Sequence, residues 1–196
     1  MENKPLIAQS DQTLLLDTHA PGFEAARAEL SAFATLEKSP EHFHTYRLDA
    51  LSLWNAASAG LGPEALMDTV RRYSRYDLPP ALEPFVRETM SRFGATVLTA
   101  VESPDGAAGA QANRLRLSCR DPFVRAEIAG SRRLASFLHQ DGDGFLLALT
   151  DRGNVKRELA RLGWPALDEA PVVDGAPFPL ALQQVRPGGA AFGLRG

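Results

Sequence analysis

The stretch SPEHFHTYRLDALSLWNAASAGLGPEALMDTVRRYSRY, residues 39–76, joins a strand pattern to two helix patterns. Residues 42–48 alternate their side chains as a β-strand does. Asp49 is a suitable N-cap for a helix over residues 50–59, and Pro63 suits the first position of a second helix. A strand followed by consecutive helices, with further strands on both sides, predicts an α+β fold.

The segments before and after this stretch extend the pattern. PLIAQSDQTLLLDT (5–18) has two apolar runs around a polar turn, which predicts a hairpin or two edge strands. GFEAARAELSAFATLEKS (22–39) carries apolar residues three or four apart and predicts one amphipathic helix. DLPPALEPFVRETMSRFG (77–94) predicts a third helix of the middle region, which Gly94 can end.

The second half alternates between strands and helices. We expect strands at 95–102, 114–119 and 141–150 and helices at 121–138 and 151–165, the first of these helices with a break near Gly130. Between the first two strands, SPDGAAGAQAN (103–113) has the small and polar composition of a flexible hairpin loop. These elements predict a small mixed α/β unit.

A chain of 196 residues can form one domain or two of about 100 residues each. We predict a unit at 1–101, built from N-terminal strands and helices, and a smaller mixed α/β unit at 113–167. Residues 168–196 are rich in proline, glycine and alanine and are predicted to be a linker.

The total charge gives no reason to expect a polyanion as partner. The chain has 21 basic and 24 acidic residues, a net charge of −3. The excess of acid lies before residue 100, so any nucleic-acid contact is expected as a local patch in the second half. A single cysteine excludes an internal disulfide. No apolar run approaches the roughly 20 residues needed to span a membrane, and the N-terminus lacks the pattern of a secretory signal. We therefore expect a cytoplasmic protein.

Two histidines two positions apart raise the question of a metal site. On a strand, His42 and His44 would point to the same face, but a metal needs a third and usually a fourth ligand. The other candidates, His19, His139 and Cys119, are isolated in the sequence. We predict no structural metal.

The arginines of the second helix admit two interpretations. Arg71, Arg72 and Arg75 lie opposite the apolar face, and Asp68 precedes the first two at the spacing of intrahelical ion pairs. This charge pattern favours a solvated face over a DNA-contacting one. These three arginines are therefore secondary candidates for DNA binding.

Taken together, these segments resemble a known family. The strand, the helices and the segment RRYSRYDLPPALEPFVRETMSRFG resemble the N-terminal region of XPB-family DNA helicases, which include the translocase subunit of transcription factor TFIIH and bacterial relatives. The shared residues are His44, Tyr46, Leu48, Ser52, Leu53, Gly60, Ser74, Pro79 and Gly94. Later, GFLLALTDRGNVKRELARLGWPALDEAPV is similar to the family's damage-recognition domain, and FGLRG to the junction before the motor.

The resemblance implies the non-motor part of a larger helicase. The chain has no G-x-x-x-x-G-K-[ST] loop to hold a nucleotide, so we expect no ATPase activity from it alone, with ATP and magnesium belonging to the motor. The implied role is to help the motor grip DNA during nucleotide excision repair, with damage recognition near residues 121–165. The implied partners are DNA, the motor domains in cis, and a repair nuclease or regulatory protein. A bacterial member would be cytoplasmic and associated with the nucleoid.

The second half offers the better candidates for contact with phosphates. Lysine and arginine bind phosphates without reading sequence. The candidates are Arg132, Arg133, Arg152, Lys156 and Arg157, with Arg161 following in the same helix. Two alternatives remain open: a protein-interaction module that docks the helicase to a partner, and a stand-alone winged-helix DNA-binding regulator, which would need a basic recognition helix.

Overall fold

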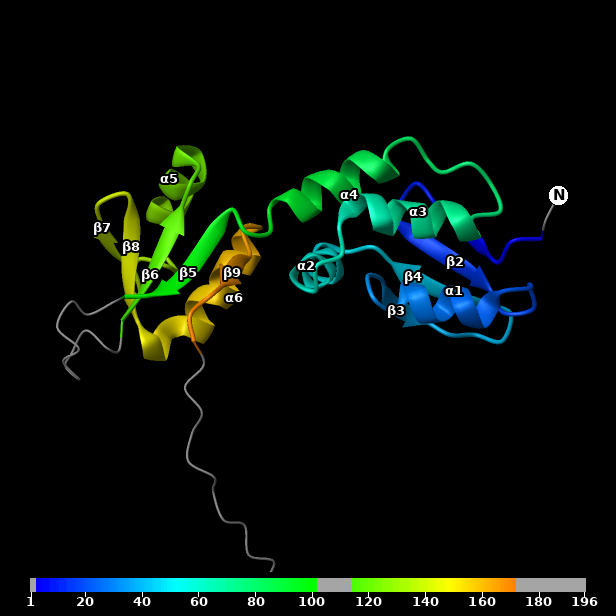
Figure 1. Ribbon diagram of the computed structural model, residues 1–196, viewed down its shortest axis with the longest axis horizontal. Coiled ribbons are helices and arrows are strands. Elements are labelled where there is room, and N and C mark those ends of the chain that lie inside the picture. Colours follow the sequence, from blue (N-terminus) through cyan, green and yellow to red (C-terminus); the bar gives the residue numbers. More distant parts are fainter. Residues whose placement is uncertain (1–2, 102–113, 172–196) are drawn as a thin grey trace, which may run out of the picture.

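The computed structural model describes residues 3–101 and 114–171, which form two sheets with six helices (Figure 1). The elements of the first half are β1 Leu6–Ala8, β2 Thr13–Asp17, α1 Phe23–Leu30, β3 Thr35–Lys38, β4 Phe43–Arg47, α2 Ala50–Ser58, α3 Pro63–Tyr73 and α4 Leu82–Ser91. Those of the second half are β5 Thr96–Ala100, β6 Arg114–Cys119, α5 Pro122–Gly130, β7 His139–Asp141, β8 Gly144–Ala148, a 3-10 turn at Leu149–Asp151, α6 Arg152–Leu162 and β9 Ala166–Asp168. The α+β class predicted from the sequence is confirmed.

The first sheet is antiparallel, with the strand order β1-β2-β4-β3. Its β1–β2 hairpin forms as expected, and Leu14 lies opposite Tyr46 in the pairing of β2 with β4. Both side chains are buried in a core to which the sheet and the helices α1 to α4 all contribute. We call residues 3–91 the first unit.

Local signals position the helices of the first unit. The Asp49 carboxylate accepts a hydrogen bond from the Ser52 backbone N–H (2.8 Å), and the Ser52 hydroxyl receives one from the Asp49 N–H (3.2 Å). This reciprocal capping box starts α2, as the sequence predicts. Pro63 occupies the first position of α3.

The second sheet is mixed, with the order β7-β8-β6-β5-β9 and a parallel pairing of β5 with β9. Its own apolar core contains residues of α5 and α6, among them Ile128, Val155 and Leu159. We call residues 96–101 and 114–171 the second unit. That each unit folds by itself stays a prediction.

One expectation about secondary structure is wrong. The helix predicted at 22–39 ends at Leu30, because Ala34 N–H donates back to the Leu30 carbonyl and Thr35 then enters β3 opposite Arg47. Pairing with β4, which is distant in sequence, outweighs the local helical period. The strand β5 forms where the sequence predicts it and pairs with β6 and β9 in the second sheet, so the predicted boundary at residue 101 follows this strand in the sequence.

The C-terminal boundary also differs from the expected linker at 168–196. Asp168 is the last residue of β9, and Ala170 is buried in the second core. Residues 172–196 and the expected hairpin loop at 103–113 lie outside the described residues. Within the described ranges, no helix is long and apolar enough to cross a membrane.

Candidate nucleic-acid interface

Arg75, two residues after the last residue of α3, connects the segment that follows this helix to the first sheet. Its Nη2 donates to Asp17 Oδ2 (2.8 Å) and its Nε donates to the carbonyl oxygen of Lys4 (2.8 Å). Both charged side chains of the Arg75–Asp17 pair are largely buried. The hydrogen bond from Arg75 lowers the pKa of the Asp17 carboxyl below its ordinary value. Arg75 therefore has a structural task.

Arg72 contacts α1 rather than Asp68, with which the sequence would pair it. Its Nη1 donates to Glu29 Oε1 (3.0 Å), and the Tyr73 hydroxyl donates to the same oxygen (2.7 Å). The hydrogen bond from Tyr73 and the charge of Arg72 lower the pKa of Glu29, and the same bond raises the pKa of Tyr73. This contact joins α3 to α1.

Arg71 belongs to an ion-pair network between α3 and α4. It contacts Asp68 (3.0 Å), as expected, and also Glu83, which in turn receives a hydrogen bond from Arg87 (2.7 Å). Arg87 also contacts Glu64. Three carboxylates thus face two guanidinium groups, and the network has no excess positive charge to offer a phosphate.

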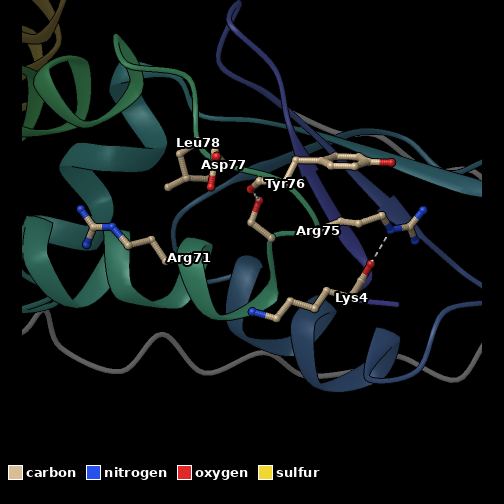
Figure 2. Close-up of a pocket in the computed structure, with 7 residues that line it drawn as sticks. Lys4, Arg71, Arg75, Tyr76, Asp77 and Leu78 are labelled. Atoms are coloured by element: carbon tan, nitrogen blue, oxygen red, sulfur yellow. Dashed lines mark hydrogen bonds between the residues drawn. The ribbon is translucent and has the colours of Figure 1, made fainter. Parts of the chain in front are cut away.

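A hollow of about 520 Å³ opens where α3 ends (Figure 2). It is lined by Lys4, Arg71, Ser74, Arg75, Tyr76, Asp77 and Leu78. Figure 2 shows the Arg75 guanidinium bonded to the Lys4 carbonyl oxygen. The two arginines of this hollow are engaged with carboxylates, so its positive charge is largely compensated.

His42 and His44, considered as two ligands of one metal, have different neighbours in the structure. His42 precedes β4, and its Nδ1 lies 2.9 Å from His19 Nε2 in a hydrogen bond. His44 is in β4, where its ring packs edge-on against Phe23. Among the described residues, no three His, Cys, Asp or Glu side chains are grouped to hold a metal ion. That the protein has no structural metal stays a prediction.

In the second unit, two of the predicted phosphate ligands are bound to Asp168. Arg152 donates from Nε (2.9 Å) and Nη2 (2.8 Å) to the two carboxylate oxygens of Asp168, and Lys156 Nζ donates to Oδ2 (2.8 Å). Arg152 also donates to the carbonyl oxygens of Ala170 and Pro171. Burial acts to raise the pKa of Asp168, but the hydrogen bonds from Arg152 and Lys156 outweigh it and lower this pKa.

Three other arginines surround a single carboxylate. Glu158 Oε1 accepts a hydrogen bond from Arg161 (2.6 Å) and lies 3.8 Å from Arg157 Nε, while Arg133 Nη1 lies 3.6 Å from Oε2. The Glu158 side chain is only 10% exposed, whereas those of Arg133, Arg157 and Arg161 are 72%, 61% and 57% exposed. We call these three arginines the Glu158 arginine cluster. They outnumber the carboxylate that they contact by three to one.

The structure therefore divides the predicted set. Arg133 and Arg157 meet at Glu158, Arg152 and Lys156 meet at Asp168, and Arg132 is exposed without a side-chain partner in the described ranges. The predicted set does not include Arg161, although its i,i+4 spacing from Arg157 puts both on one helical face. Sequence spacing cannot show that Arg133 lies near these two arginines. Arg133 is in the turn after α5, and only the fold brings it to Glu158.

Comparisons with known proteins agree with the resemblance seen in the sequence. The family described as "Helicase conserved C-terminal domain" matches residues 6–142, most of the chain, so the chain belongs to this helicase family. It is a homologue of the XPB-family DNA 3'-5' helicases. The family name refers to a C-terminal domain, and the N-terminal placement suggested by the sequence stays a prediction.

Three relatives illustrate the similarity. The chain is 44% identical over 177 residues to "DNA 3'-5' helicase XPB" of Kineococcus radiotolerans, covering 89% of the chain and 30% of the relative. It is 40% identical over 186 residues to the protein of the same name in Mycobacterium tuberculosis, covering 94% and 32%. With the TFIIH helicase/translocase subunit XPB of Encephalitozoon cuniculi, identity is 23% over 168 residues, covering 86% and 24%. The chain thus spans about a third of the length of its bacterial relatives.

Proposed function

We propose that this chain is an accessory region of an XPB-like DNA helicase and contacts the phosphate backbone of DNA through its second unit. The observation that carries this proposal is the Glu158 arginine cluster. Three exposed guanidinium groups from two segments face one largely buried carboxylate, which leaves a local excess of positive charge in a protein that is acidic overall. Arginine in this setting binds phosphate oxygens without reading the base sequence.

The first unit supports the same assignment by contrast. The arginines Arg71, Arg72 and Arg75 are each paired with a carboxylate of another element, and the network around Arg71 is acidic overall. The α4 arginines Arg87 and Arg92 are likewise paired with glutamates, which disfavours a winged-helix regulator reading DNA through that helix.

Within the parent helicase, we assign the chain to holding DNA for the motor during nucleotide excision repair, with damage recognition in the second unit. ATP and magnesium belong to the motor in this proposal, and the chain alone hydrolyses no nucleotide. The bacterial relatives favour a cytoplasmic protein that works on the nucleoid. A second candidate is docking to a repair nuclease or regulatory protein, favoured by the first unit because its arginines already have carboxylate partners.

A salt-titrated DNA-binding measurement tests the proposal. The chain should bind duplex DNA weakly, with an affinity that falls steeply with salt. Replacing Arg157 and Arg161 by alanine should weaken binding equally for unrelated sequences and flatten the salt slope by about one unit for each phosphate that is no longer bound. Arg71→Ala with Arg72→Ala is the matched control and should leave both unchanged. The proposal fails if the chain does not bind DNA, or if only the control pair affects binding.

A further inference from the structure

A second hollow, of about 650 Å³, lies where the end of α6 approaches α2 and α4. Its lining includes Leu51, Trp54, Glu88, Thr89, Arg92 and Arg161. Figure 1 shows these helices on the two sides of the connection between α4 and β5. The volume falls within the range of about 300–1,000 Å³ that is typical of ligand pockets.

The floor of this hollow is apolar and held in place. The Trp54 indole N–H donates to the carbonyl oxygen of Thr89 (2.8 Å), which fixes the ring between α2 and α4. Leu51, three residues earlier on α2, is 61% exposed. Leu51 therefore gives the lining of this hollow an accessible apolar side chain.

Guanidinium groups flank this apolar floor. Arg92 stacks over the ring of Trp164, 5.2 Å from its centroid, and is also held by Glu88 (2.7 Å). Arg161 lines the hollow and is at the same time a member of the Glu158 arginine cluster. The hollow and the Glu158 arginine cluster are therefore adjacent, because Arg161 belongs to both.

We propose that this hollow receives an unpaired nucleobase of a strand whose phosphates lie on the Glu158 arginine cluster. Trp54 is only 8% exposed and the Trp164 ring lies beneath Arg92, so the stacking plane for a base is the Arg92 guanidinium. Bases stack on arginine planes as well as on aromatic rings, and such stacking tolerates any base because each has a π-face. An apolar peptide would use Leu51 and Trp54 but would gain nothing from the adjacent excess of arginine. This inference rests on the proposed DNA contact and adds a preference for unpaired bases.

The chain's own tryptophans provide the readout. It has only two, and Trp54 lines the hollow while Trp164 follows Gly163 and stacks on Arg92. A thymidine oligonucleotide, an abasic strand of equal length and the corresponding duplex should be titrated against the full chain. We expect the thymidine strand to quench tryptophan fluorescence and to bind at least about fivefold more tightly than the abasic strand, which has the same phosphates.

Variants distinguish the binding of a base in the hollow from the contact with phosphates. Leu51→Ala should reduce the preference for the thymidine strand while keeping the salt dependence, because Leu51 is exposed and carries no charge. Leu36→Ala, at another exposed leucine on β3, is the control and should change nothing. Equal binding of thymidine and abasic strands without quenching overturns this inference and leaves the proposed phosphate contact intact. Absence of binding to all three ligands overturns the proposed function itself.

Discussion

Arg152, the first residue of α6, donates two hydrogen bonds to Asp168, the last residue of β9. Both charged side chains are largely buried, and the same guanidinium also donates hydrogen bonds to two backbone carbonyl oxygens that follow β9. Such a bidentate pair has little freedom to contact a phosphate. Its geometry instead attaches the edge strand β9 to α6, so that these residues stabilise the second unit.

Removing the Asp168 carboxylate should therefore destabilise the protein. Asp168→Ala leaves Arg152 partly buried without its counter-charge, and we expect a loss of about 2–4 kcal/mol in the free energy of unfolding. Urea denaturation followed by circular dichroism measures this loss. Glu169→Ala, at the exposed next position, is the control. If the two variants have equal stability, the Arg152–Asp168 pair contributes little to the fold.

The same carboxylates predict how stability depends on pH. The pKa values of Asp168, Asp17 and Glu29 are lower in the folded protein than their ordinary values. A lowered folded-state pKa stabilises the protein above the unfolded-state pKa, and this contribution is lost as pH falls through the folded-state pKa. The free energy of unfolding should thus decrease from about pH 5 downward. Denaturation curves at several pH values measure it, and Asp168→Asn should flatten the decrease.

Arg75, just after α3, and Arg71, within α3, should differ in their contribution to stability. Arg75→Met removes a largely buried pair with Asp17 and the bond to the Lys4 carbonyl, so we expect a loss of about 1–3 kcal/mol. Arg71→Met removes exposed ion pairs and should change stability little. Both unfolding free energies can be measured with urea. A greater loss for Arg71→Met would contradict the structural task assigned to Arg75.

The sequence predicts the first unit best where the signals are local. Asp49 and Pro63 mark helix starts that need no distant partner, and the structure has them as expected. The error at Thr35 has the opposite cause, because β3 exists only through pairing with β4. A period-3.6 pattern in this segment cannot report a partner strand.

The candidate site was predictable only in part for the same reason. Composition indicated that the second half holds the available arginines, but not which of them are already neutralised. Arg152 and Lys156 are already neutralised by Asp168, because β9 places this carboxylate beside α6. Arg133 reaches Glu158 from 25 residues earlier in the chain (158 minus 133), a contact that requires the folded second unit.

Replacing Glu158 should strengthen DNA binding, whereas replacing the arginines around it should weaken DNA binding. If the surrounding arginines hold a phosphate, the Glu158 carboxylate competes with that phosphate for the same guanidinium groups. Glu158→Gln keeps an oxygen that can accept from Arg161 but removes the negative charge. We therefore expect tighter DNA binding, by about three- to tenfold at low salt, with a steeper salt dependence.

The measurement is a DNA titration at several salt concentrations on the Glu158→Gln protein, after circular dichroism has established that it is folded. Glu169→Gln removes the same charge at an exposed position of the same unit and controls for the change in net charge. A general electrostatic effect would raise the affinity of both variants equally, whereas a phosphate on the Glu158 arginine cluster favours Glu158→Gln. If Glu158→Gln binds no more tightly than the control, these arginines serve to neutralise Glu158, and DNA is bound elsewhere.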